Sequence, residues 1–157
     1  MSSFSMTKHV EAEPQMVFEA CTDFASLAQR VKGIEKVEML TDGPVGVGTR
    51  FRETRIMFGK EATEEMEVTA FEPGKGFTLE ANSCGCRFIS HHSFQAEGKG
   101  TQLTLSIESR PLTFFAKLMT PVGWLFQGMM KKCVEQDLDN LKKSVEARAG
   151  NVSSPAE

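Results

Sequence analysis

The chain of 157 residues has no tyrosine, one tryptophan and no long uninterrupted apolar run. A transmembrane helix needs a run of about 18 or more, so we expect none here. The absence of tyrosine excludes any mechanism that uses a tyrosine hydroxyl as an acid. Basic residues are not in excess either: the net charge is −3, which gives no electrostatic basis for binding nucleic acid. The N-terminal segment "MSSFSMTKHVEAEP" lacks the basic and apolar regions of a signal peptide, which predicts a cytoplasmic protein.

Cysteine is also scarce, with four residues in the chain, and in a cytosol we expect them to be reduced thiols. Two of them fall with two histidines in "NSCGCRFISHH", residues 82–92, which raises the question of a metal site. If Cys84-Gly85 is a hairpin turn, His91 and His92 are neighbours on a strand and point to opposite faces. The C-x-C spacing also differs from the C-x₂-C of zinc sites. The sequence therefore predicts no metal and no cofactor.

Phenylalanine and methionine are abundant, with twelve and nine residues. Both fill apolar space without needing a hydrogen-bond partner, and methionine adapts its shape to its surroundings. Two interpretations fit this composition: a densely packed core, or a cavity with soft apolar walls.

The order of predicted elements is a strand over 3–11, two short helices within 12–33, six strands between 34 and 110, and a helix from 111 to about 149. Pro14 suits a first helical turn, Gly33 marks a stop, and Pro121 should kink or break the last helix near its first third. Consecutive strands on short loops predict an α+β fold with a seven-stranded antiparallel sheet packed on the long C-terminal helix. The tail 149–157 is predicted to be disordered.

Hairpin registers define which side chains share the inner face of the sheet. A Cys84-Gly85 turn pairs Phe77 with His92 and Leu79 with Ser90, and keeps the apolar residues of both strands on one face. By the same alternation, Phe94 should oppose Leu103. The preceding strand should place Met66, Val68 and Ala70 opposite Ala81, Leu79 and Phe77.

Charged residues also fall on this inner face. A Gly59-Lys60 turn would place Phe51 opposite Val68, Glu53 opposite Met66, and Arg55 opposite Glu64. Buried charges are costly unless they are paired or solvated, so Arg55 is expected to pair with the two glutamates. Two interpretations stay open: an ion pair at a wet end of the sheet, or a polar anchor inside a ligand-filled cavity. For His92, a satisfied core histidine and a ligand-orienting group are both open.

The C-terminal helix carries an apolar stripe that is predicted to face the core. The stripe comprises Phe126, Met130, Val134, Leu138, Leu141 and Val145. The segment from Phe114 to Phe126 is apolar on nearly every side, which predicts burial or contact with something apolar. Three roles fit it: capping a cavity, contacting a second copy of the chain, or touching a membrane surface.

Several segments together resemble the START-like (SRPBCC) superfamily, in particular its polyketide cyclase/dehydratase-type members. They are "VEAEPQMVFEACTDFASLAQ", "TDGPVGVGTRFRET", "EVTAFEPGKGFTLE", "SFQAEGKGTQLTLSIE" and "KKCVEQDLDNLKKSVEA". The resemblance implies a helix-grip fold over residues 1–148, in which a curved seven-stranded sheet wraps the C-terminal helix around a hydrophobic cavity. It transfers no catalytic residue, because the superfamily has no shared catalytic motif.

These observations predict a carrier or sensor that binds a small hydrophobic molecule, a lipid or an aromatic polyketide-like metabolite. An alternative is a cyclase/dehydratase-type enzyme that uses His92 as general acid or base with Glu53, Arg55 and Glu64. A third is a partner-binding module that uses residues 114–126. The predicted ligand-binding residues are Phe51, Glu53, Arg55, Glu64, Met66, Val68, Phe77, Leu79, Phe88, Ser90, His92, Phe94, Leu105, Trp124 and Met130.

Overall fold

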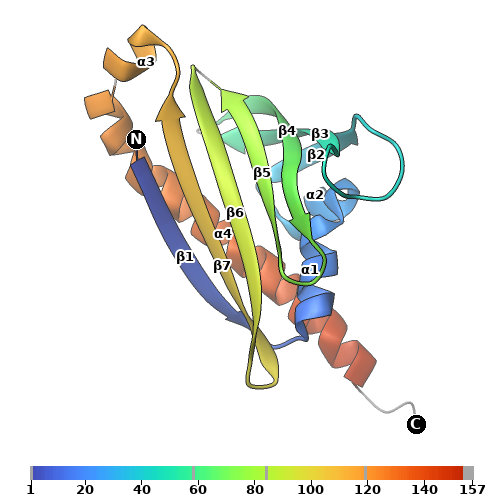
Figure 1. The fold of residues 1–157 in the computed structure, drawn as a ribbon. Coiled ribbons are helices and arrows are strands. Elements are labelled where there is room, and N and C mark those ends of the chain that lie inside the picture. The colour runs from blue at the N-terminus through green and yellow to red at the C-terminus, as the bar shows by residue number, and fades with distance from the viewer. Residues whose placement is uncertain (1, 58, 84, 119, 154–157) are drawn as a thin grey trace.

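The computed structural model describes residues 2–57, 59–83, 85–118 and 120–153; for residues 2, 57, 120–126 and 151–153 it describes the backbone alone. Seven antiparallel strands form one sheet in the order β1-β7-β6-β5-β4-β3-β2. The long helix α4 runs diagonally across one face of this sheet, and the short helices between β1 and β2 lie at its side (Figure 1). This arrangement is the predicted helix-grip fold.

The strands are β1 (Ser2–Val10), β2 (Ile34–Met39), β3 (Arg50–Met57), β4 (Lys60–Glu72), β5 (Gly76–Ser83), β6 (Cys86–Glu97) and β7 (Gly100–Pro111). The helices are α1 (Pro14–Thr22), the 3₁₀ turn η1 (Phe24–Ser26), α2 (Leu27–Arg30), α3 (Phe114–Leu118) and α4 (Thr120–Ser153). Pro14 occupies the start of α1, where its missing N–H costs no helical hydrogen bond.

Aromatic side chains join the short helices to the sheet. Phe18 of α1 makes edge-to-face contacts with Phe71 and Phe94 at ring-centroid distances of 5.4 and 5.3 Å. Phe24 of η1 stacks on Phe51 at 4.4 Å. The predicted stripe of α4 closes the other side of this core, with Val134, Leu138, Leu141 and Val145 all buried.

The predicted registers of the two later hairpins are confirmed. Phe77 pairs with His92 and Leu79 with Ser90, and Phe94 pairs with Leu103. His91 therefore lies on the outer face, where its Nδ1 is 3.0 Å from the Thr78 hydroxyl, while His92 points inward.

Two registers differ from the prediction. Met57 pairs with Lys60, so Gly59, with φ of +76°, takes the second position of the β3–β4 turn instead of the first. The strands therefore shift by two residues: Phe51 opposes Met66, Glu53 opposes Glu64, and Arg55 opposes Ala62. Because side chains alternate with period two, this shift leaves every residue on its predicted face.

The second difference is a bulge between Val68 and Ala70 of β4. It follows two confirmed pairs, Met66 with Ala81 and Val68 with Leu79. Beyond the bulge Phe71, not Ala70, opposes Phe77, because the extra residue reverses the alternation. Phe71 is thereby brought to the ring of Phe18.

The C-terminal segment is divided into α3 and α4, and Pro121 lies in the first turn of α4, where proline is tolerated. α4 extends to Ser153, so the predicted disordered tail is wrong for 149–153; residues 154–157 lie outside the described part. Among the described residues, no helix is both long and apolar enough to cross a membrane.

Candidate functional site

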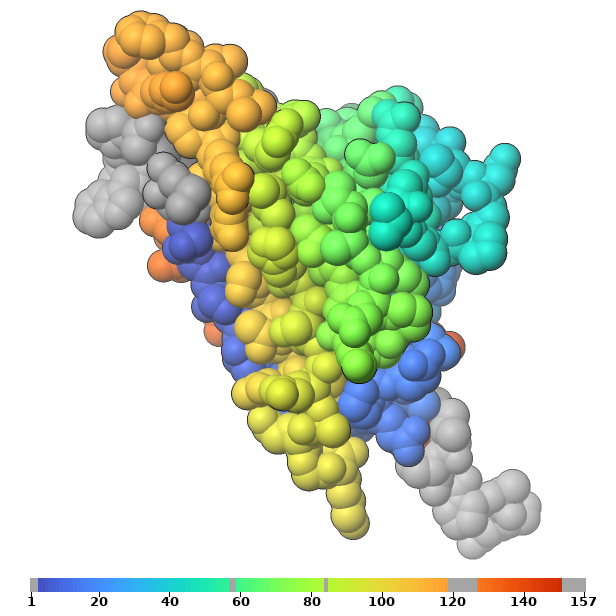
Figure 2. Space-filling model, viewed as in Figure 1, coloured from blue at the N-terminus to red at the C-terminus, as the bar shows by residue number. Residues whose placement is uncertain are grey.

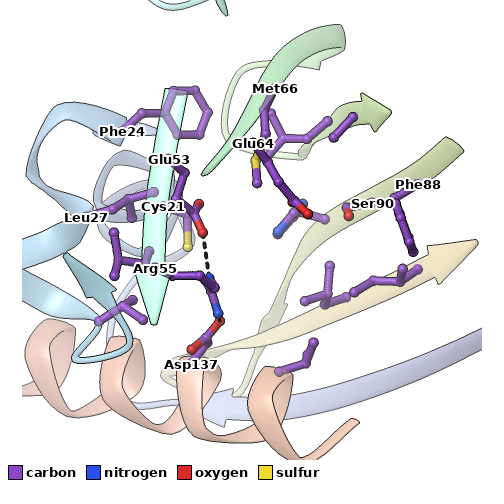
Figure 3. Close-up of a pocket in the computed structure, with 18 of the residues that line it drawn as sticks. Cys21, Phe24, Leu27, Glu53, Arg55, Glu64, Met66, Phe88, Ser90 and Asp137 are labelled. Atoms are coloured by element: carbon purple, nitrogen blue, oxygen red, sulfur yellow. Dashed lines mark hydrogen bonds and ion pairs between the residues drawn. The ribbon is translucent and has the colours of Figure 1, made fainter. Parts of the chain in front are cut away.

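A cavity of about 250 Å³ lies between the sheet and α4 (Figure 3). One wall comes from the strands β3 to β7, a second from α4, and a third from the corner formed by η1, α2 and the start of β2. The predicted residues that line it are Phe51, Glu53, Arg55, Glu64, Met66, Phe77, Leu79, Phe88, Ser90, His92, Leu105 and Met130.

Two predicted site residues lie outside this wall, and a third is not described. Val68 and Phe94 are core residues, exposed by 1% and 6%, and neither lines the cavity. Phe94 lies further along β6 than His92, at the point where α1 covers the sheet, so Phe18 packs on it. The side chain of Trp124 lies outside the described part of α4.

Sequence reasoning missed two acidic residues of the cavity wall, Asp137 and Glu80, and the apolar corner made by Phe24, Leu27, Val31 and Ile34. The signal for Asp137 was available. It is three residues after Val134 and four before Leu141, so a carboxylate interrupts the apolar stripe of α4.

Arg55 is held between two carboxylates from different elements. Its Nε donates to Glu53 Oε1 at 2.7 Å, and its Nη1 donates to Asp137 Oδ2 at 2.9 Å. The predicted pair between Arg55 and Glu64 is wrong, because the register shift places Glu64 opposite Glu53 instead. In the part of the chain that the structure describes, Glu64 has neither an ion pair nor a side-chain hydrogen bond.

Burial sets the electrostatics of this group. It raises the pKa of Glu53, whose side chain is 8% exposed, although the charge of Arg55 opposes the rise. The pKa of Asp137 is raised for the same reason and with the same opposition. Burial acts to lower the pKa of Arg55, but Glu53 and Asp137 outweigh it and raise that pKa. Arg55 therefore stays charged, while both carboxylates bind protons more readily than in water.

His92 also lines the cavity, with its ring stacked on that of Phe77 at 4.3 Å and 9°. Desolvation lowers the pKa of His92 to about 4, so the ring is neutral at pH 7. Its Nδ1 is buried without a hydrogen-bond partner among the described residues. A backbone hydrogen bond at Ser90 acts on the ring, but the unpaired Nδ1 is costly, since unpaired buried nitrogens are rare in native cores.

The Cys21 thiol is not an activated nucleophile. Cys21 lines the cavity, but burial raises its pKa, so it stays protonated. Cys21, Cys86 and Cys133 carry free thiols, and Cys84 lies outside the described residues. No group of three or more His, Cys, Asp or Glu suited to a metal ion occurs within the described ranges.

The short helix α3 does not cap the cavity, since none of its residues is in the cavity wall. It projects beyond the end of the sheet, as the protrusion coloured orange in Figure 2. Phe114, Phe115 and Leu118 are 80%, 74% and 63% exposed there. Large apolar side chains gathered at one exposed site commonly mark a contact surface.

Comparison with known proteins identifies the family to which the sequence is similar. Residues 1–146 match the model of a family described as "Polyketide cyclase / dehydrase and lipid transport". A search of curated protein sequences finds no match.

Solved structures share the fold at low sequence identity. TTHA0849 from Thermus thermophilus is 24% identical, with a TM-score of 0.76 over 98% of this chain and 100% of that one. The Zhui aromatase/cyclase from Streptomyces sp. R1128 is 19% identical, with a TM-score of 0.77 over 94% of each chain. Ara h 8.0201 is 16% identical, with a TM-score of 0.71 over 93% of this chain and 98% of that one.

Proposed function

The chain belongs to the polyketide cyclase/dehydrase and lipid transport family, and we propose that it binds a small, mainly apolar molecule in the cavity between the sheet and α4. In this proposal the protein is a carrier or sensor, and the ligand is a lipid or an aromatic, polyketide-like metabolite. A cytoplasmic location remains a prediction from the sequence.

The observation that carries the proposal is the composition of the cavity wall. Side chains of phenylalanine, leucine, isoleucine, valine and methionine form most of it, and a few polar groups converge on it from β3, β4, β6 and α4. Ligand pockets have this composition, since apolar area supplies affinity and a small number of polar groups fix orientation. A fully packed core seldom retains a buried nitrogen such as His92 Nδ1 without a hydrogen bond.

The test places a tryptophan side chain in the cavity in one variant and on the outer face of the sheet in a control variant. Met66→Trp adds volume at the wall, whereas Glu67→Trp adds the same residue at the next position, on the outer face of β4. An environment-sensitive apolar dye should bind wild type and Glu67→Trp with a Kd near the micromolar range, about −8 kcal/mol. Met66→Trp should bind at least tenfold more weakly.

Two results would contradict ligand binding in this cavity. Destabilisation of Met66→Trp by more than about 3 kcal/mol would mean that the space is already packed. Equal dye binding by all three proteins would place the dye elsewhere. Native mass spectrometry of protein purified from its own host would show the natural ligand directly.

A second candidate function is enzymatic, and the neutral His92 favours it. A neutral imidazole in the wall of an apolar cavity accepts a proton from a bound molecule. Proton transfer of this kind suits a cyclisation or dehydration. His92→Gln should then abolish turnover of a short β-polyketone followed by absorbance, while retaining its binding; unchanged turnover, or none by wild type, would exclude this candidate.

We also propose that α3 touches an anionic lipid surface. The exposed Phe114, Phe115 and Leu118 could enter the apolar region, and Lys117, Arg87 and Arg110 lie on the same end of the molecule. Arg87 and Arg110 face each other across β6 and β7, so their positive charges repel, and a negatively charged lipid surface would reduce this repulsion. Glu108 also pairs with Arg110, at 2.9 Å.

A second copy of the chain fits this patch less well. Among the described residues, the four apolar side chains here, with Leu112 included, expose roughly 500 Å² at the usual area per side chain. A stable dimer interface buries about 800 Å² on each partner.

A further inference from the structure

The charges inside the cavity do not balance. Four acidic residues belong to the wall: Glu53, Glu64 and Asp137, whose side chains face inward, and Glu80, which alternates with Leu79 and Ala81 and so points its side chain to the outer face. Among the described residues of the wall, Arg55 is the one cationic side chain. With Arg55 and the three inward-facing carboxylates ionised the sum is 1 − 3 = −2, and the neutral ring of His92 adds nothing at pH 7. Arg55 is already engaged by Glu53 and Asp137, so its charge is used within the protein.

The uncompensated charge is concentrated at Glu64. Glu64 lies directly opposite Glu53 across the β3–β4 ladder, and like charges in this position repel. Figure 3 shows its carboxylate pointing into the space between Arg55 and Ser90, where a bound molecule would lie. A carboxylate in such a site accepts hydrogen bonds and cannot donate them while it is ionised.

His92 adds no positive charge to this wall. Its ring lines the cavity, but its Nδ1 is buried, with no hydrogen bond in the described part of the chain, and does not open into the cavity. A polar ligand would therefore satisfy Glu64, and neither Glu64 nor the neutral His92 offers the positive charge that an anionic ligand needs.

We propose that this cavity selects apolar molecules that carry a hydrogen-bond donor, a hydroxyl or a protonated amine received by Glu64, and discriminates against molecules that end in a carboxylate. The inference rests on the proposed binding function and narrows it. A fatty acid or aromatic acid that approached Arg55 would also come close to Glu53, Asp137 and Glu64, and would meet net repulsion.

The test uses four naphthalene probes of similar size at pH 7, with affinities measured by calorimetry. 2-Naphthol carries a hydroxyl donor, 2-naphthylmethylamine a cationic donor, 2-methoxynaphthalene no donor, and 2-naphthoate a negative charge. Wild type should bind at least one donor probe tenfold or more tighter than both the methyl ether and the naphthoate. The first two probes distinguish a hydroxyl from an ammonium as the preferred donor.

Glu64→Gln tests the residue that carries the selection. It keeps the shape of the side chain and removes its charge, so the ratio of donor-probe to naphthoate affinity should fall at least fivefold. Glu67→Gln, on the outer face of the same strand, is the matched control and should leave that ratio unchanged. If Glu64→Gln does not fold, the comparison of naphthol with its methyl ether on wild type still decides the proposal.

The outcomes distinguish failure of the proposed ligand selection from failure of the proposed binding function. Naphthoate binding as tightly as the donor probes, or a ratio that Glu64→Gln does not change, would overturn the selection and leave the binding function standing. No detectable binding of any probe by wild type would overturn the binding function, and the selection with it.

Discussion

Replacing His92 by glutamine tests whether the imidazole is held neutral in a dry cavity. In the folded protein the pKa of His92 is about 4, against its usual 6.5. Between these values the unfolded chain binds a proton that the native state does not. Stability therefore falls as the pH falls from 6.5 toward 4, and this loss is absent above 6.5.

The expected loss of stability depends on how much of the pH range between 4 and 6.5 the measurement covers. Between pH 8 and pH 5, the interval from 6.5 to 5 contributes, and each pH unit corresponds to about 1.4 kcal/mol. The upper bound is thus about 2 kcal/mol, and we expect about 1–2 because one side of the ring faces the cavity. Glutamine does not titrate, so His92→Gln should lack this loss.

The assay is urea unfolding of wild type and His92→Gln at pH 8 and pH 5. The titrations of Glu53 and Asp137 occur in both proteins and cancel in the difference between the two pH dependences. His91→Gln is the control, since it removes an exposed imidazole from the outer face of the same strand. If wild type and His92→Gln lose the same stability between pH 8 and pH 5, within about 0.5 kcal/mol, the buried neutral histidine is refuted.

Two further predictions concern Arg55 and the α3 tip. Arg55→Met strands Glu53 and Asp137, whose side chains are 8% and 28% exposed, and should cost about 3 kcal/mol at pH 8. The cost should be smaller at pH 5, because the raised pKa values of Glu53 and Asp137 let the folded protein bind protons there. Adding Glu53→Gln and Asp137→Asn to Arg55→Met should restore stability. A loss of stability under about 1 kcal/mol at both pH values would contradict a buried ion group. At the tip, Phe114→Ser with Phe115→Ser should reduce sedimentation with phosphatidylglycerol vesicles at least fivefold without altering dye binding. Equal sedimentation of wild type with phosphatidylcholine vesicles, or none with either, would remove the proposed lipid contact.

The sequence by itself determined the order of the elements and the face of the sheet residues, except beyond the β4 bulge, where Phe71 replaces Ala70 opposite Phe77. Period-two alternation is a local property, and it survived even where the register was mispredicted: the two-residue shift between β3 and β4 left Glu53, Arg55 and Glu64 facing inward. The Cys84-Gly85 and Phe94–Leu103 predictions held for the same reason, since the turn residues agreed with the apolar alternation on both strands.

Tertiary structure decided which inward-facing groups meet. The choice between two adjacent turn positions around Gly59 changed the partner of Arg55 across the ladder, and both turns satisfied the same pattern. Asp137 reaches Arg55 from a helix 82 residues away, at 2.9 Å. The helical period shows that Asp137 shares a face with Val134 and Leu141, but the height and angle at which α4 crosses the sheet come from the packing of the whole core. The ion group and the unpaired Glu64 depend on that crossing, so they follow from the assembled fold and from no local stretch of the chain.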